Sequence, residues 1–187
     1  IKVNDNGLGM SDTDARLCFE RHATSKIKSV DDLFSLHTKG FRGEALASIA
    51  AIAHVELRTK KKESDIGSLL IIEGSQCTEQ TLCQCENGST FAIKNLFYNV
   101  PARRNFLKSD NVEYNHILDE FLRIVLVHPD IAFSLYHNDK QEYKLPKSNL
   151  KQRIVNVFGN PYNERLLPIR QESNVTNISG FIGKPEC

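Results

Sequence analysis

The residues best suited to chemistry lie in two glycine-containing segments. The first, Asp5-Asn6-Gly7-Leu8-Gly9, follows an alternating, strand-like start at Ile1–Asn4. A carboxylate at the end of such a strand can accept a hydrogen bond from an exocyclic amine, as adenine offers. Asp-Asn-Gly is also typical of a tight turn, in which Asp5 only shapes the loop. Taken alone, this segment favours the turn.

The second segment is Gly40-Phe41-Arg42-Gly43-Glu44-Ala45-Leu46, which ends a long polar stretch and opens an apolar helix. The first backbone N–H groups of a helix have no partner within the helix and lie at its positive end. Glycines there let a phosphate approach the backbone closely. A plain glycine-rich helix entry explains the same residues, so both interpretations stand.

Other nucleotide-binding and catalytic patterns fail. G-x-G-x-x-G is broken because position 12 is Asp, and no P-loop pattern occurs. Ser25-x-x-Lys28 matches S-x-x-K, but no K-T-G follows it, which indicates an accidental match. The histidines lack metal-ligand spacing with one another, so we expect no catalytic histidine.

The cysteines indicate reduced thiols rather than a metal site. The sequence has 5 cysteines, an odd number, and no Cys-x-x-Cys pair. Cys83 and Cys85 are spaced to share one face of a strand, but no histidine lies near them. Half-buried thiols in a cytosolic protein are the expected outcome.

Periodicity predicts the elements that must position these segments. Ser11 with Asp14 forms a capping signal for a short helix that ends near Phe19. A Gly43–Ala53 helix precedes an antiparallel meander in which Asn87-Gly88 turns one strand into the next. The remaining predicted elements are a helix at Asn111–Val127, a hairpin around Asn138-Asp139, a helix at Leu150–Phe158 closed by Gly159, and two final strands.

Length and composition limit the function classes. The chain has 187 residues with 40% hydrophobic content, which is enough for a core and for one domain or slightly more. Lys+Arg is 24 against Asp+Glu 23, so the net charge of +1 excludes a chain that binds nucleic acid by charge alone. No apolar stretch reaches the ~20 residues that a bilayer requires. Strand-like segments at both ends are typical of a piece of a longer chain.

Considered together, these segments resemble the MutL family of DNA mismatch-repair ATPases, within the GHKL superfamily. The resemblance spans the chain and is strongest over residues 5–108. Its strings are D-N-G-x-G, Arg21-His22-Ala23-Thr24-Ser25-Lys26-Ile27, Gly40-Phe41-Arg42-Gly43-Glu44-Ala45-Leu46-Ala47-Ser48-Ile49, and Leu96-Phe97-Tyr98-Asn99-Val100-Pro101-Ala102-Arg103-Arg104 with Phe106-Leu107.

The resemblance implies roles for particular residues. It assigns Asp5 to the adenine amine, Gly7 and Gly9 to the adenine pocket, and Thr90 to the pocket lining. The stretch from about Phe19 to Gly43 would be the ATP lid. The implied phosphate-side residues are Thr24, Ser25 and Lys26 in the lid, Arg42 and Gly43 beside it, and Glu44, Ala45 and Leu46 through their backbone.

Parts of the family's machinery have no match here. The Glu that activates water and the Asn that holds Mg²⁺ lie, in the family, on a helix upstream of D-N-G-x-G. A Lys that reaches the γ-phosphate belongs to the second domain and matches nothing in residues 150–187. We therefore expect no catalytic residue and no metal ligand within these 187 residues, and no useful hydrolysis by them alone.

The resemblance also implies an architecture. We expect an α/β (α+β) two-layer sandwich of the GHKL type, with a mixed or antiparallel sheet and helices on one face. Residues 1–147 would form the ATPase domain without its first helix and motif. Residues 148–187 would begin a second, ribosomal-S5-like α/β domain.

The implied function is ATP binding and hydrolysis that couple lid closure and dimerisation to mismatch repair. The implied partners are ATP with Mg²⁺, DNA bound weakly or without specificity, a MutS-type mismatch-recognition protein, and a second copy or a paralogue. The implied location is the cytoplasm or nucleoid of a bacterium, or a eukaryotic nucleus. The alternatives are a non-catalytic DNA-binding scaffold, against which Asp5 and Gly40–Leu46 argue, and another GHKL ATPase, against which the long strings argue.

Overall fold

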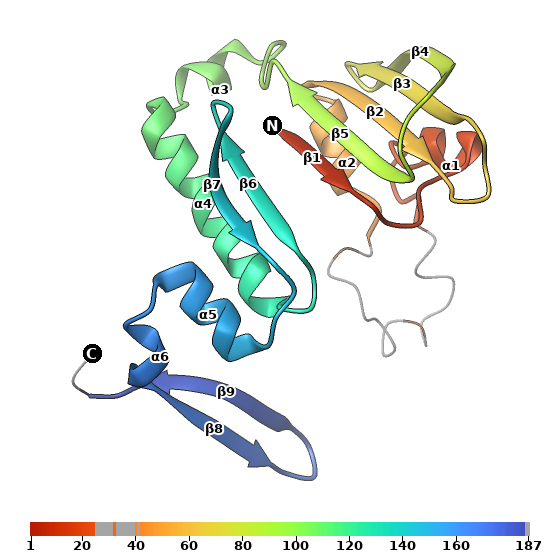
Figure 1. Cartoon of the computed structure of the whole chain (residues 1–187). Coiled ribbons are helices and arrows are strands. Elements are labelled where there is room, and N and C mark those ends of the chain that lie inside the picture. The colour runs from red at the N-terminus through yellow and green to blue at the C-terminus, as the bar shows by residue number, and fades with distance from the viewer. Residues whose placement is uncertain (25–31, 33–39, 41, 186–187) are drawn as a thin grey trace. The chain divides into compact units, whose positions relative to one another are not determined.

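The computed structural model describes residues 1–24, 32, 40 and 42–185. They form two compact units, Ile1–Leu107 and Lys108–Cys187 (Figure 1). The domain boundary predicted after residue 147 lies inside the second unit and stays a prediction. No helix among the described residues is both long enough and apolar enough to cross a membrane.

The first unit is built on a five-stranded sheet in which every neighbouring pair is antiparallel. The strand order is β1-β5-β2-β3-β4, so the fifth strand lies between the first and the second. The strands are β1 (Lys2–Asp5), β2 (His54–Lys60), β3 (Gly67–Glu73), β4 (Gln76–Cys83) and β5 (Gly88–Lys94).

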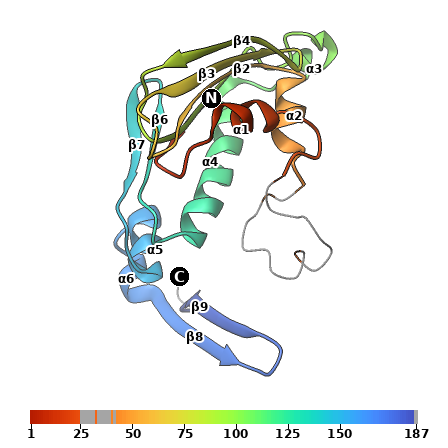
Figure 2. The same cartoon turned by 90° about the vertical axis from the view of Figure 1, so that its right-hand side faces the viewer.

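Two short helices, α1 (Asp12–Leu17) and α2 (Ala45–Ala50), cover one face of this sheet (Figure 2). Alternate residues of β2 are buried under them, as a strand with one covered face requires. The core consists of Ala15, Phe19, Ala50, Val55, Leu57, Leu70 and Ile72. The predicted two-layer fold with helices on one face is confirmed.

The turn predicted at Asn87-Gly88 is wrong. β4 and β5 are not neighbours, because β5 pairs with β1 and β2 while β4 pairs with β3. Gly88 is instead the first residue of β5, with φ +107°. A Cβ on it would lie 2.1 Å from the carbonyl oxygen of Asp5, so close strand packing explains this glycine.

The capping signal at Ser11 is confirmed, and the predicted helix at Gly43–Ala53 is shorter than expected. The Ser11 hydroxyl accepts a hydrogen bond from the backbone N–H of Asp14 at 3.2 Å. The pKa of Asp14 is lowered by hydrogen bonds from Ser11 and Lys61. Gly43 has φ +66° and therefore cannot belong to α2, which ends at Ala50 before a turn leads into β2.

A short helix, α3 (Pro101–Asn105), follows β5 in the first unit. Proline at its start fits the first turn of a helix. Arg103 and Arg104 are exposed on it, as a solvated helix start would have them. Neither arginine forms an ion pair with a described residue.

The second unit contains helices and two hairpins close to those predicted. Asn138 and Asp139 have φ 49° and 65°, as a two-residue type I′ turn requires. The elements are α4 (Asp110–Val127), β6 (Phe133–His137), β7 (Lys140–Leu145), α5 (Leu150–Phe158), α6 (Tyr162–Arg165), β8 (Leu166–Glu172) and β9 (Asn177–Gly183).

Arg153 of α5 joins these elements from a fully buried position. One guanidinium nitrogen donates to the carbonyl of Val125, in the last turn of α4, at 3.3 Å. The other donates to Pro129, Ile131 and Pro146 at 3.0, 2.6 and 2.9 Å. Carbonyls at the end of a helix and in the loop that follows it thus receive donors from one cation. Burial lowers the pKa of Arg153.

We expect Arg153→Ala to lower the free energy of unfolding of the second unit by about 3 kcal/mol or more, because it leaves buried carbonyls without donors. Denaturant unfolding of the purified protein measures this change. The matched control is Arg123→Ala, which removes only the exposed pair with Glu120 and should cost less than about 1 kcal/mol. Equal losses for the two variants would contradict the role of Arg153.

Candidate functional site

The pairing of β1 with β5 sets the geometry around Asp5. Asp5 lies opposite Ser89, and Ser89 lies opposite Thr59 of β2 on its other side. Residues directly opposite each other in a sheet share a face. Asp5, Ser89 and Thr59 therefore form a row across three strands, on the face that α1 and α2 cover.

The Thr59 hydroxyl is buried and fully used within this row. It donates to the carbonyl of Gly88 at 2.9 Å and accepts the backbone N–H of Met10 at 2.9 Å. Its oxygen also lies 3.1 Å from the Ser89 hydroxyl. A hydroxyl has one proton, so Ser89 must be the donor in that contact. The Ser89 oxygen is then left with acceptor capacity only.

Asp5 forms the predicted turn with one carboxylate oxygen, and its other carboxylate oxygen is available to a ligand. Its Oδ1 accepts the backbone N–H of Gly7 at 2.9 Å, which is an Asx-type turn. Its Oδ2 accepts no hydrogen bond from any described residue, and the side chain is exposed. Shaping the loop and accepting a ligand's hydrogen bond are thus compatible roles for one carboxylate.

The two glycines of the first segment are required by close approaches. Gly9 has φ +66°, and a Cβ on it would lie 2.0 Å from the carbonyl oxygen of Lys60. A Cβ on Gly7 would lie 2.9 Å from Oδ1 of Asp5. These contacts hold the loop after β1 against the end of β2 and close to the Asp5 carboxylate.

The ends of the long polar stretch meet each other. Gly43 has φ +66°, and a Cβ on it would lie 2.3 Å from the carbonyl oxygen of Ala23. Next to this contact, His22 Nδ1 lies 3.4 Å from Glu44 Oε1. Residues 22–23 and 43–44 therefore close the base of the segment that the resemblance identifies as the ATP lid.

The remaining phosphate-side candidates are placed as follows. Thr24 and Arg42 already have partners within the chain. Ser25 and Lys26 lie outside the described residues, as does most of the predicted lid. Ala45 is exposed at the start of α2, whereas the Leu46 side chain packs against the core. The backbone role predicted for Leu46 is compatible with that packing and stays a prediction.

Thr90 is not brought to Asp5. It lies opposite Asn4, on the sheet face away from the helices, and its hydroxyl donates to Asn4 Oδ1 at 2.6 Å. Side chains alternate along a strand, so Thr90 and Ser89 must face opposite ways. The structure thus places Ser89, which sequence reasoning missed, and not Thr90 on the same face as Asp5. The signal available in the sequence was the hydroxyl directly after Gly88.

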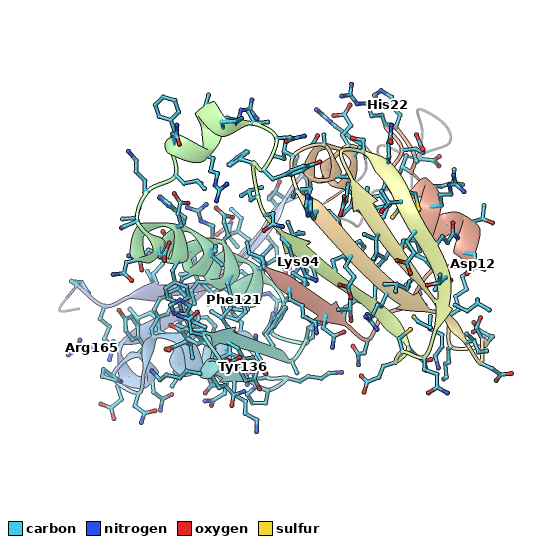
Figure 3. All side chains as sticks on the ribbon, turned by 90° about the horizontal axis from the view of Figure 1, so that it is seen from above. Asp12, His22, Lys94, Phe121, Tyr136 and Arg165 are labelled. Atoms are coloured by element: carbon cyan, nitrogen blue, oxygen red, sulfur yellow. The ribbon has the colours of Figure 1, made fainter. Side chains whose placement is uncertain are left out.

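Two surface depressions border α1, on the side where Figure 3 labels Asp12. Their volumes are about 280 and 330 Å³, and neither is lined by Asp5 or Ser89. The described residues also form no cluster of three or more His, Cys, Asp or Glu that could hold a metal ion.

The chain is similar in fold to solved structures. One is the MutL ATPase domain of Aquifex aeolicus complexed with ADP, 23% identical, with a TM-score of 0.68 over 91% of this chain and 59% of that one. Another is the N-terminal domain of a DNA repair protein, 22% identical, with a TM-score of 0.76 over 98% of this chain and 59% of that one. At this level of identity the likeness shows the fold.

Curated relatives are far more similar in sequence. The DNA mismatch repair protein MutL of Flavobacterium psychrophilum is 60% identical over 186 residues, and that of Parabacteroides distasonis is 55% identical over the same number. Both alignments cover 100% of this chain, which spans 30% of the length of either relative. No protein-family model matches the chain. Identity at this level along the whole chain, together with the shared fold, places the protein in the MutL family.

Proposed function

We propose that the protein containing these residues binds ATP and hydrolyses it to drive DNA mismatch repair. Membership of the MutL family supports the process. The observation that carries the nucleotide site is the row formed by Asp5, Ser89 and Thr59 across β1, β5 and β2. This row supplies hydrogen-bond acceptors next to the glycine-containing loop that follows β1.

Adenine recognition follows from the hydrogen-bonding capacity of this row. The adenine amine offers two N–H donors, and Asp5 Oδ2 and the Ser89 oxygen both accept. Guanine carries a carbonyl where adenine has the amine. That carbonyl would face acceptors and leave them without donors, so the site favours ATP over GTP.

The phosphates would lie toward Gly43 and the start of α2. The proposed contacts there are Thr24, Ser25, Lys26, Arg42, Gly43, Glu44, Ala45 and Leu46. Support comes from the contact between Gly43 and Ala23, because it fixes the two ends of the lid segment beside the helix entry. A γ-phosphate that contacts the lid in only one of its positions would shift the population toward closure.

Closure would in turn favour association with a second copy or a paralogue. In the family-based view, this nucleotide-controlled dimer works with a MutS-type protein on DNA. Hydrolysis resets it. A scaffold that has lost nucleotide binding remains the alternative function, and the intact Asp5 site argues against it.

Hydrolysis would require groups beyond those placed here. The water-activating Glu and the Mg²⁺ ligand belong, by resemblance, to a helix upstream of Asp5. The helix-side face of β1 is compatible with such a helix, since Val3 on that face is 54% exposed and apolar. We therefore assign residues 1–187 the adenine side and the lid.

Asp5→Ala should weaken ATP binding by the full-length protein about 10–150-fold, since a hydrogen bond to a charged group is worth about 1.5–3 kcal/mol. Calorimetry with ATP and with GTP measures this effect and the preference for adenine. Asp119→Ala, which removes an exposed carboxylate of α4, is the control and should bind ATP normally. Equal affinity of the unaltered protein for ATP and GTP would contradict the role of Asp5.

Ser89→Ala and Thr90→Ala form a matched pair on adjacent residues of β5. Ser89→Ala should lower ATP affinity roughly 2–12-fold, the effect of one neutral hydrogen bond of about 0.5–1.5 kcal/mol. Thr90→Ala should leave it unchanged, because Thr90 faces away from Asp5. Thermal unfolding of both variants separates binding from stability, and a larger affinity loss for Thr90→Ala would reverse the assignment.

A polypeptide of these 187 residues alone should release phosphate from ATP far more slowly than the full-length protein. Loss of a positioned base alone costs about 10²–10⁴-fold in rate. A steady-state phosphate-release assay on equal concentrations of both proteins measures the ratio. Matching rates would show that the base lies within residues 1–187.

A further inference from the structure

Two cysteines, Cys83 and Cys85, lie next to each other at the edge of the first unit's sheet. Cys83 is the last residue of β4, and Cys85 lies in the connection that leads to β5. Both thiols are half-buried and free. Neither thiol takes part in the proposed nucleotide site.

Gly67 of β3 makes room for this pair. Cys83 is the strand partner of Gly67, and the sulfur of Cys85 lies over the same glycine. A Cβ on Gly67 would be only 2.4 Å from that sulfur. Both cysteines therefore lie against the same glycine. Burial and the adjacent Cys85 thiol raise the pKa of Cys83.

A cation lies beside the pair. Arg58 of β2 interacts electrostatically with both sulfurs, while its guanidinium Nε is fixed by Glu56 at 2.9 Å. The guanidinium opposes the rise in the pKa of Cys83 without outweighing burial, and the thiolate that it favours is the form that attacks disulfides. The site thus combines neighbouring thiols, partial access to solvent and a positive charge.

The two other described cysteines have different surroundings. Burial raises the pKa of the Cys18 thiol to about 11, so it is hardly ionised near neutral pH. Cys77 lies opposite Ile72 and packs against the core under the helices, on the other face of the sheet from Cys83. Neither has a second thiol beside it.

The connection that carries Cys85 also controls the approach of β5 to Asp5. It runs from Cys83 to Gly88, where the backbone is pressed against the carbonyl of Asp5. The next residue, Ser89, completes the row with Thr59. A covalent change between Cys83 and Cys85 would alter the path of this short connection and so the position of Gly88 and Ser89.

We propose that Cys83 and Cys85 are a reversible thiol-oxidation site that adjusts the start of β5. The thiolate of one cysteine attacks a low-molecular-weight disulfide and expels one thiolate from it, which takes up a proton. The second cysteine then attacks the mixed disulfide, forms the Cys83–Cys85 bond and expels the other thiol. Two protein thiols are oxidised and one small disulfide is reduced to two thiols.

The Cys83–Cys85 disulfide would be easily reduced and would not act as a permanent cross-link. Cys-x-Cys closes a very small ring, and Cys83 is held at the end of an extended strand, so we expect a Cys83–Cys85 disulfide to be strained. Strained disulfides are more easily reduced and are typical of regulatory sites. Reduction by excess thiol should therefore restore the starting state.

The experiment uses the full-length protein exchanged into buffers with different ratios of glutathione to glutathione disulfide. Peptide mass spectrometry without reduction identifies linked cysteines. Hydrogen exchange follows the backbone amides of residues 88–91. Oxidation should produce a Cys83–Cys85 link, reversed by excess glutathione, and should speed exchange at these amides several-fold. Cys83→Ser and Cys85→Ser should abolish both effects, whereas Cys77→Ser should retain them.

Absence of the Cys83–Cys85 link at every ratio, including stable glutathione adducts on the separate thiols, would overturn the proposal. A link that forms without any change in exchange at residues 88–91 would overturn it as well. Both readouts are independent of ATP. If they behave as expected while neither redox state binds ATP, the proposed nucleotide function fails and the oxidation site stands.

Discussion

The first unit depends on the position of β5, which hydrogen-bonds to β1 on one side and to β2 on the other. The chain reaches β1 at its very start and β5 only some eighty residues later, so their pairing is a long-range contact. It brings the Asp5 loop, the end of β2 and the start of β5 to one place. The glycines at positions 9 and 88 are needed because three backbones converge there.

A single buried hydroxyl completes that convergence. Thr59 joins the loop after β1, through Met10, to the start of β5, through Gly88 and Ser89. All of its hydrogen-bonding capacity is used, so the neutral network carries no unpaired buried group at this point. Thr59 also accepts the proton of the Ser89 hydroxyl, so the Ser89 oxygen stays available as an acceptor on the face that Asp5 shares.

The second unit reaches a similar result with a charge. Arg153 supplies donors to the end of α4, to the loop that follows, and to the segment before α5. The guanidinium also lies over the Phe133 ring, with its carbon 5.5 Å from the ring centroid. Both units thus use one buried polar side chain to hydrogen-bond backbone groups from segments that are separate in sequence.

Local features could be predicted from the sequence: the Ser11 cap, the α4 and α5 helices, the Asn138-Asp139 turn and the strings that resemble the family. These depend on neighbours within a few residues, which periodicity and turn chemistry report. The strand pairing was needed to show that Asn87-Gly88 is not a hairpin turn and that Ser89, not Thr90, shares a face with Asp5. Strand order and register are set by packing of distant segments, and a shift of one residue reverses every side chain.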